Sequence, residues 1–464
     1  MCGDRGLAPR RKGETGVLGE KRLREIAESV IDLATGDQTE VIVSSGQTDL
    51  TRFAVNTIHQ NVTETETSVR VRAIRGRKTG VASGNDVGKE GLARIVEMAE
   101  SAAQLQQENP EFVSLPKPEP STPVNAFVEA TAACAPEERA DRVNVILALA
   151  RENGLEAAGA FSTETEELMV ANSLGIRAHY VRTIADVRTV VMGRMGSGFG
   201  SQTSTDVRAL DPGAVGQEAV DKALRSADAT DVEPGEYTVI LEEEAVADMV
   251  RSLGFMGFGA LAFQERRSFM SGRIGETVTG DAITIWDDGR DLCGLPLPFD
   301  FEGVPKRRVV LIEGGVAKNV VYDSFTAGRE DGVKSTGHAL PSPNPRGPVP
   351  INLFMETGSE TKEEMLSATK RGIWVTRFHY TNPVHPVKTV LTGMTRDGTF
   401  LIENGKITRP IKNLRFTQSI LEALAKVDMV GTTAKIVKSG YGSFAVSAPA
   451  VRTHGFRFTG TTDF

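Results

Sequence analysis

Residues 68–83 read SVRVRAIRGRKTGVAS, and this stretch decides the character of the first part of the chain. Apolar residues from Val69 to Ala73 alternate with arginines, and Gly76 follows where the pattern reverses. Successive side chains of a β-strand point to opposite faces, so the alternation places the apolar side chains on one face. Together with the glycine turn, it predicts a β-hairpin whose arginines form a solvated face.

Amphipathic helices are predicted on both sides of this hairpin. Residues 21–35, KRLREIAESVIDLAT, carry apolar side chains at helical spacing and end before Gly36, a residue type that commonly follows a helix. Residues 91–107, GLARIVEMAESAAQLQQ, predict a second long helix, and residues 39–45 and 50–61 predict strands. The order helix, antiparallel strands, helix is that of an α+β unit.

The middle of the chain repeats this order after a proline-rich break. Residues 109–124 contain five prolines, which predicts an extended linker or a segment that wraps around the protein. A helix, several strands and another helix are predicted again within residues 125–231. The strand pairs SVRVRAIRGR and GIRAHYVRTI resemble each other weakly, so a distant internal duplication is a hypothesis.

Short strands and glycine turns dominate from residue 232 onward, beginning with a strand at 236–241 and a helix from residue 243. We therefore predict an α+β fold: an N-terminal α+β region of helices packed on antiparallel strands, followed by a large, mostly β C-terminal domain. The expected segments are a disordered tail at 1–18, an N-terminal α+β subdomain at 19–108, the proline-rich linker at 109–124, a second α+β subdomain at 125–231 and a mixed-β domain at 232–464.

Composition excludes several classes of protein. The 464 residues include 53 Lys and Arg against 61 Asp and Glu, a net charge of -8, which argues against a nucleic-acid binder. No run of 18 apolar residues occurs, so we expect no membrane span. Three scattered cysteines exclude a disulfide framework, and the N-terminus lacks the apolar stretch of a signal peptide. We therefore expect a cytoplasmic protein.

Catalytic motifs are weak when they are read from the residues alone. None of the six histidines precedes a glutamate, and no histidine pair has the spacing of a helical zinc site. Ser335 and Thr336 lie close before His338, but that local spacing favours a polar turn over a nucleophile with its base. Acidic residues between 287 and 302 lack the spacing of a calcium loop and fit turns. The glycine-rich residues 192–200 lack a phosphate-loop lysine and favour a flexible loop or close backbone packing.

Two longer blocks of sequence are far more characteristic than these short motifs. Residues 299–339, FDFEGVPKRRVVLIEGGVAKNVVYDSFTAGREDGVKSTGHA, and residues 377–424, which include TGMTRDGTFLIENGKITRP, resemble the TldD/TldE (PmbA) family. The resemblance extends over nearly the whole chain, from about residue 21 to residue 458. It implies a dimeric protein with an N-terminal α+β region and a mostly β C-terminal domain.

The family has two branches, and the resemblance implies a different role for each. In the TldD branch, an HExxxH helix and a later cysteine hold zinc in a metallopeptidase that acts on unfolded peptides and peptide precursors. The TldE branch lacks these ligands and serves as the structural partner. Here the positions that match the motif are Arg251, Ser252 and Met256, and no cysteine follows Cys293. The resemblance therefore implies a TldE-like, non-catalytic subunit without a cofactor, with zinc in a TldD-like partner.

Other functions remain open at this stage. The chain is alternatively a stand-alone homodimeric binder of peptides or a small ligand, or a peptidase with unrecognised catalytic residues such as His338, His379 or His385. A DNA-binding regulator is disfavoured by the charge. The uncharged stretch LGFMGFGALAF at 253–263 is too apolar for a free surface and fits either an interface or the core. The residues that we expect at a cavity or interface are Phe255, Phe258, Ser335, Thr336, His338 and His379.

Overall fold

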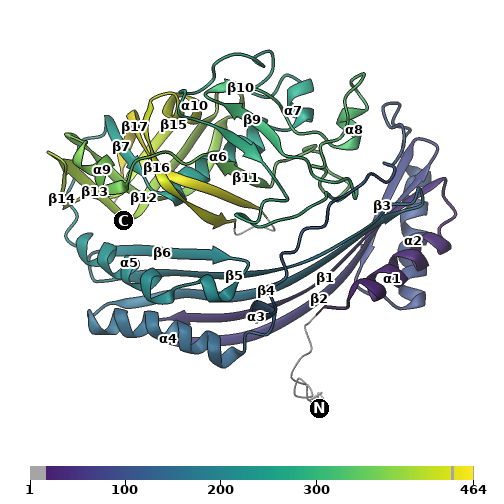
Figure 1. Cartoon of the computed structure of the whole chain (residues 1–464), viewed down its shortest axis with the longest axis horizontal. Coiled ribbons are helices and arrows are strands. Elements are labelled where there is room, and N and C mark those ends of the chain that lie inside the picture. Colours follow the sequence, from purple (N-terminus) through teal and green to yellow (C-terminus); the bar gives the residue numbers. More distant parts are fainter. Residues whose placement is uncertain (1–16, 440–443, 463–464) are drawn as a thin grey trace.

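The computed structural model describes residues 17–439 and 444–462 and shows two layers (Figure 1). The lower layer is a long antiparallel sheet with helices beneath it, and the upper layer is a second, larger β domain. This arrangement confirms the α+β fold class. Most of the tail expected at 1–18 lies outside the described residues.

The lower layer is built from one order of elements that occurs twice. It begins with α1 (Glu20–Leu33), β1 (Gln38–Ala54), β2 (Thr57–Arg75), β3 (Lys78–Gly84) and α2 (Lys89–Leu105). After the short α3 (Glu129–Ala132), the same order returns as α4 (Pro136–Glu152), β4 (Glu156–Asn172), β5 (Arg177–Met192), β6 (Ser197–Ser204) and α5 (Pro212–Arg225), with a 3₁₀ turn at Val207–Ala209. The hairpin predicted at 68–83 is confirmed as β2 and β3, and Gly76 has the positive φ of its turn.

Both α+β units contribute to a single six-stranded sheet. Its strand order is β3-β2-β1-β4-β5-β6, and β1 pairs with β4 along most of its length. The two units therefore meet strand to strand in the middle of the sheet, and neither has a separate sheet of its own.

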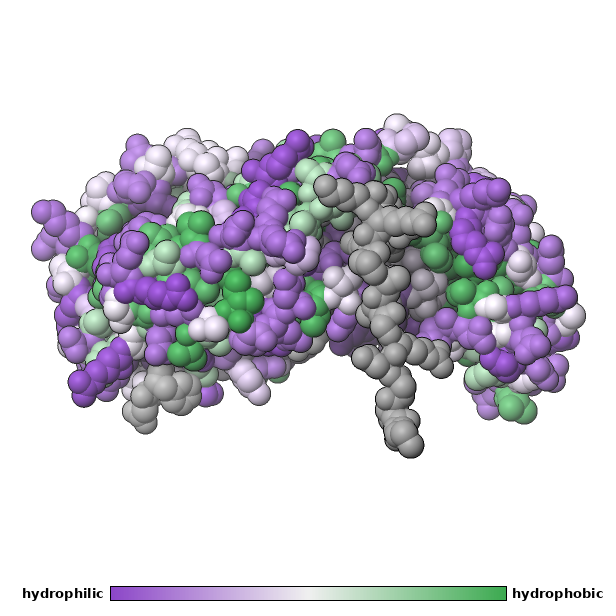
Figure 2. Space-filling model, turned by 90° about the horizontal axis from the view of Figure 1, so that it is seen from below, coloured by the Kyte–Doolittle hydropathy of each residue, from purple (hydrophilic) through white to green (hydrophobic). Residues whose placement is uncertain are grey.

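The helices cover one face of this sheet. At one end, α1 and α2 pack on Val41, Val69 and their neighbours, because α1 buries an apolar stripe that includes Leu23 and Ile26. At the other end, α4 and α5 form an equivalent core around Phe161. The helix-covered side, seen in Figure 2, is mainly hydrophilic, with hydrophobic side chains in small groups. The opposite face of the sheet, here called the inner face, is turned toward the C-terminal domain.

The proline-rich segment is extended and lies against the sheet. Leu115 N donates to Gln38 Oε1 at 2.8 Å, and Asn172 Nδ2 donates to Pro116 O at 2.8 Å. Ala126 then forms a bridge with Arg182 and packs with apolar residues of both layers. This segment wraps along the protein, as one of the two sequence interpretations proposed.

The C-terminal domain is an eleven-stranded mixed sheet around the largest core of the protein. Its strands are β7 (Glu236–Leu241), β8 (Ile285–Asp287), β9 (Val309–Glu313), β10 (Val316–Ala317), β11 (Asn352–Met355), β12 (Arg371–His385), β13 (Val390–Glu403), β14 (Lys406–Pro410), β15 (Leu414–Ser419), β16 (Val427–Lys438) and β17 (Ala445–Thr461). Its helices are α6 (Glu243–Gly257), α7 (Ala260–Gln264), α8 (Ser324–Ala327), α9 (Lys362–Ser367) and α10 (Ile420–Leu424), with a 3₁₀ turn at Pro386–Lys388. Among the described helices, none is long and apolar enough to cross a bilayer.

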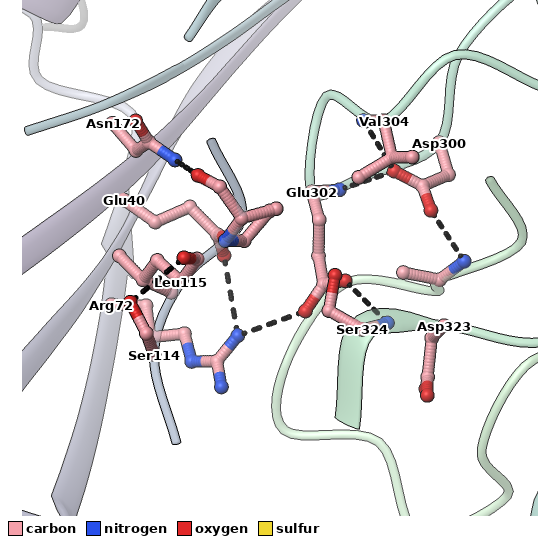
Figure 3. Close-up of polar contacts among 12 residues, drawn as sticks. Glu40, Arg72, Ser114, Leu115, Asn172, Asp300, Glu302, Val304, Asp323 and Ser324 are labelled. Atoms are coloured by element: carbon pink, nitrogen blue, oxygen red, sulfur yellow. Dashed lines mark hydrogen bonds and ion pairs between the residues drawn. The ribbon is translucent and has the colours of Figure 1, made fainter. Parts of the chain in front are cut away.

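Polar contacts join the two layers at both ends. At the α5 end, Lys222 Nζ lies 2.6 Å from Glu242 Oε2, and Trp374 Nε1 donates to the other oxygen of the same carboxylate. At the β3 end, Arg72 lies between Glu40 of the sheet and Glu302 of the C-terminal domain (Figure 3). Between these ends, Leu168 and Tyr180 of the sheet pack against Leu297 and Phe299 of the C-terminal domain. Cavities remain beside these contacts along the inner face.

Candidate functional site

The cleft with the largest volume described here, about 740 Å³, lies between α6 and the inner face of the sheet near β5 and β6. Helix α6 begins directly after the buried strand β7, and Glu243 and Glu244 in its first turn interact favourably with the helix dipole. One face of α6 turns to the cleft and presents Glu244, Asp248, Arg251, Ser252 and Phe255. These positions follow the spacing of neighbours along a helix, and the opposite face fills the core of the domain.

At the centre of this face, polar side chains of α6 form an ion pair and a hydrogen bond within their own helix. The guanidinium of Arg251 forms an ion pair with Asp248. Ser252 Oγ donates to the backbone oxygen of Asp248 at 2.7 Å. Burial lowers the pKa of Arg251, although Glu244 acts in the opposite direction. The serine hydroxyl is thus directed back to its own helix.

Arginines and aromatic rings form the other walls of the cleft. Arg377 of β12 lies over the ring of Phe199 of β6 at 4.5 Å and donates to Asp397 at 2.7 Å. Arg346 lies 5.6 Å from the centre of the Phe255 ring. Such surfaces bind apolar side chains and backbone carbonyl groups, since guanidinium groups donate hydrogen bonds and ring faces accept cations.

Zinc does not fit this site. The positions that match the zinc motif are Arg251 and Ser252, which face the cleft, and Met256, which is only 5% exposed and belongs to the core. A guanidinium remains protonated in proteins and cannot ligate a cation. Among the described residues, no group of three or more His, Cys, Asp or Glu side chains is placed to hold a metal ion. We therefore derive no metal-dependent step for this cleft.

The two phenylalanines expected at a cavity or interface separate in the structure. Phe255 is 41% exposed, lines the cleft and contacts Phe444, with their ring centres 5.2 Å apart. Phe258 is fully buried and packs edge-to-face against Phe269 in the core. The stretch at 253–263 thus contributes both to the cleft and to the core, because the turn at the end of α6 points its aromatic side chains in different directions.

The predicted polar turn at 335–338 belongs to a buried network. His338 is 1% exposed; its Nε2 lies 2.8 Å from Asp287 Oδ1, and its Nδ1 lies 2.9 Å from Thr336 Oγ1. Burial and the charge of Lys306 lower the pKa of His338, while Asp287 acts in the opposite direction. Tyr322 N donates to the Thr336 hydroxyl at 2.8 Å, and the same hydroxyl lies 3.1 Å from Tyr322 O. The Thr336 hydroxyl is thus bonded to backbone groups of Tyr322. The connected Thr336 hydroxyl, His338 imidazole and Asp287 carboxylate therefore stabilise the fold.

The remaining candidates lie outside the cleft. Ser335 Oγ accepts from Gly337 N and lies beside Thr336. His379 of β12 contacts the ring of Tyr380, and neither is among the cleft-lining residues. Burial and the neighbouring arginines lower the pKa of His379.

Several cleft residues were missed by sequence reasoning. Glu244 and Asp248 precede Ser252 by eight and four positions, so helical spacing from the matched motif positions indicates them. Arg188, Phe199 and Arg346 had no local signal, since they reach the cleft from three distant segments. Residues 197–200 of the predicted glycine loop at 192–200 belong to β6, where a Cβ on Gly198 would lie 2.1 Å from Ala219 O. Close packing of β6 on α5 therefore explains this glycine.

Comparison with known proteins identifies the family. The PmbA/TldA metallopeptidase domain 1 matches residues 39–103, the central domain of that family matches residues 117–227, and its C-terminal domain matches residues 234–460. These matches cover most of the chain in the order expected for the family. The chain belongs to the PmbA/TldA (TldD/TldE) metallopeptidase family.

Individual relatives are more distant. A metalloprotease TldD homolog of Haemophilus influenzae is 26% identical over 395 residues, which cover 79% of this chain and 80% of that protein. A metalloprotease of Methanocaldococcus jannaschii is 30% identical over 216 residues, which cover 46% of this chain and 47% of that protein. The crystal structure of TldE from Thermococcus kodakarensis superimposes with a TM-score of 0.86 at 21% identity, over 94% of this chain and 100% of that chain. At this identity the structural likeness shows the fold.

Proposed function

We propose that this chain is the non-catalytic, TldE-like subunit of a TldD/TldE-type metallopeptidase, and that it pairs with a zinc-bearing, TldD-like subunit in the cytoplasm. One observation carries the proposal: the face of α6 that lines the cleft presents an Arg251–Asp248 ion pair and a serine whose hydroxyl is bonded to the helix. A peptidase of this family needs zinc ligands and a general base at these positions.

The buried position of His338 supports the same proposal. A hidden catalytic group must reach a substrate, whereas His338 and Asp287 are enclosed and bonded within the C-terminal domain. Within the described residues, the cleft lining contains no histidine and no cysteine. A peptidase with unrecognised catalytic residues is therefore less well supported than a subunit that holds peptide.

The role of the subunit in the complex is to hold an unfolded peptide in extended form. The cleft offers ring faces at Phe199 and Phe255 and donors at Arg346 and Arg377 for apolar side chains and backbone carbonyl groups. Neither membrane binding nor nucleic-acid binding is part of this role.

The test compares the chain alone with the chain co-expressed with an HExxxH-bearing relative from the same genome. We expect the chain alone to contain less than stoichiometric zinc by elemental analysis and to leave unfolded casein intact. The co-expressed pair is expected to elute as a heterodimer, to contain zinc and to cleave casein in a chelator-sensitive way. One tightly bound zinc in the isolated chain, together with proteolysis, would overturn the proposal. A stable homodimer that does not bind the relative would favour a stand-alone binder.

A further inference from the structure

A second cavity of about 340 Å³ lies on the inner face of the sheet, nearer its centre than the cleft beside α6. It forms where β1, β2, β4 and β5 run side by side beneath Leu297 and Phe301 of the C-terminal domain. The strand register places Glu66 of β2 and Glu166 of β4 on either side of Gly46 of β1. Because this central position has no side chain, the space between the two carboxylates stays open.

The cavity carries more negative than positive charge. Glu64 and Glu66 project from β2, and within the described part of the chain neither has a hydrogen-bond or ion-pair partner. Glu166 and Arg182 form an ion pair with 2.6 Å between Oε2 and Nη2, so the one arginine of the lining is already neutralised. An occupant with a positive charge would therefore be attracted to the Glu64 and Glu66 side of the cavity.

The opposite wall is apolar and contains a hydroxyl without a partner. Leu168, Leu297 and Phe301 form this wall together with Tyr180, which is 5% exposed. The Tyr180 hydroxyl is buried and makes no hydrogen bond to any residue that the structure describes, which is costly for a polar group. Burial raises the pKa of this hydroxyl; Arg182 lowers it and Glu166 raises it, and both of these residues line the same cavity.

We propose that this cavity binds the side chain of a lysine in an extended peptide, an inference that rests on the proposed peptide-holding function. The aliphatic stem lies along Leu168 and Phe301, and the ammonium group lies between the carboxylates and the Tyr180 hydroxyl. An ammonium group donates three hydrogen bonds in different directions, which suits separate oxygens, whereas the planar guanidinium of arginine suits one bidentate carboxylate.

The cavity is accessible to such a peptide. Glu64 and Glu66 are exposed, and the outer edge of β2 pairs with β3 only from Val69 onward in the described structure. A metal ion is a poorer occupant, because no cluster of three or more metal-ligating side chains forms among the described residues.

Calorimetric titration of the full chain with three peptides tests this inference. The peptides are N-acetylated and C-amidated Ala-Ala-Lys-Ala-Ala and its counterparts with norleucine or glutamate in place of lysine. Norleucine keeps the aliphatic stem and lacks the charge. We expect the lysine peptide to bind about tenfold more tightly than the norleucine peptide, and this advantage to shrink in 0.5 M salt.

Three variants test whether the preference for lysine arises in this cavity. Glu64→Gln combined with Glu66→Gln is expected to reduce lysine binding to the norleucine level and to leave norleucine binding unchanged. Tyr180→Phe is expected to weaken lysine binding about threefold or more without lowering the melting temperature, because the lost hydroxyl has no partner among the described residues. Glu97→Gln on the outer side of α2 is the matched control and should change nothing.

Equal affinity for the lysine and norleucine peptides would overturn the lysine site and leave peptide holding intact. Absence of binding for all three peptides would overturn both the lysine site and the peptide-holding role. Loss of lysine preference in the Glu97→Gln control would show that the preference arises elsewhere and would likewise overturn the site.

Discussion

Arg72 of the sheet donates a hydrogen bond from Nη1 to Glu302 Oε1 of the C-terminal domain at 3.4 Å, and this ion pair joins the two layers at one end. The same nitrogen lies 3.8 Å from Glu40 of β1, so one guanidinium serves two buried carboxylates (Figure 3). Asp300 and Asp323 of the C-terminal domain lie near Glu302 and add to the negative charge. Four acidic residues therefore lie around Arg72 at this junction.

This cluster of buried acidic groups around Arg72 predicts that the stability of the protein depends on pH. Burial raises the pKa of Glu40, Arg72 lowers it and the charge of Glu302 raises it, and the net result is a pKa of about 7. The folded state thus binds a proton more tightly than the unfolded state, whose glutamate has a pKa of 4.5. This contribution to the free energy of unfolding is complete at pH values below the pKa of Glu40 in the unfolded state. It is lost as the pH rises through the pKa of Glu40 in the folded state. We expect the free energy of unfolding to fall by about 1 kcal/mol between pH 6 and pH 8 from this group.

Urea unfolding at several pH values checks this dependence. Glu40→Gln should flatten the decrease between pH 6 and pH 8, because the amide does not ionise. Asp300 and Asp323, whose pKa values are raised by burial and by Glu302, contribute in the same direction and remain in the variant. An unchanged slope in Glu40→Gln, with Glu97→Gln as the reference, would contradict the assignment.

Phe255 and Phe258 should respond oppositely to the same substitution. Phe258→Asp places an unpaired carboxylate in the core and is expected to cost several kcal/mol, enough to unfold the C-terminal domain. Phe255→Asp changes a side chain at the cleft and should leave the chain folded while weakening peptide binding. Circular dichroism with light scattering distinguishes the two results, and a folded Phe258→Asp protein would refute the core position.

The buried network around Asp287 should be essential for stability. Asp287 Oδ1 lies 3.2 Å from Lys306 Nζ and 2.8 Å from His338 Nε2, and Asn352 N donates to Oδ2 at 2.7 Å. Asp287→Asn leaves the buried Lys306 without a counter-ion, so we expect a loss of about 3–5 kcal/mol. Asp288→Asn at the adjacent turn is the control and should change stability by less than about 1 kcal/mol. Comparable denaturation midpoints for the two variants would contradict this structural role.

Duplex DNA should bind weakly at physiological salt. The net charge is -8, and the arginines Arg70 and Arg72 of the predicted basic face make contacts with the C-terminal domain. Fluorescence anisotropy with a labelled duplex is expected to show no sub-micromolar affinity. Tight binding with a steep dependence on salt would instead require a basic surface that the charge distribution does not suggest.

Part of the fold follows from local pattern. The hairpin of β2 and β3, the amphipathic α1 and α2, and the β7–α6 junction were predicted because their signals lie within about 20 neighbouring residues. The arginines at 70 and 72 were interpreted wrongly as a solvated face, since the C-terminal domain that covers them lies more than 200 positions further along the chain.

The sequence by itself determined the kind of elements, the α+β class, the family and the loss of the zinc motif, because these depend on side-chain periodicity and on which residues are present. Only the tertiary structure decided that both α+β units share one sheet through β1 and β4, whose paired residues Gly46 and Glu166 are 120 positions apart. It also decided that Phe255 faces the cleft while Met256 and Phe258 are buried, since packing against the whole domain sets the rotation of α6. Contacts of this kind depend on the summed burial of distant segments, which no local pattern contains.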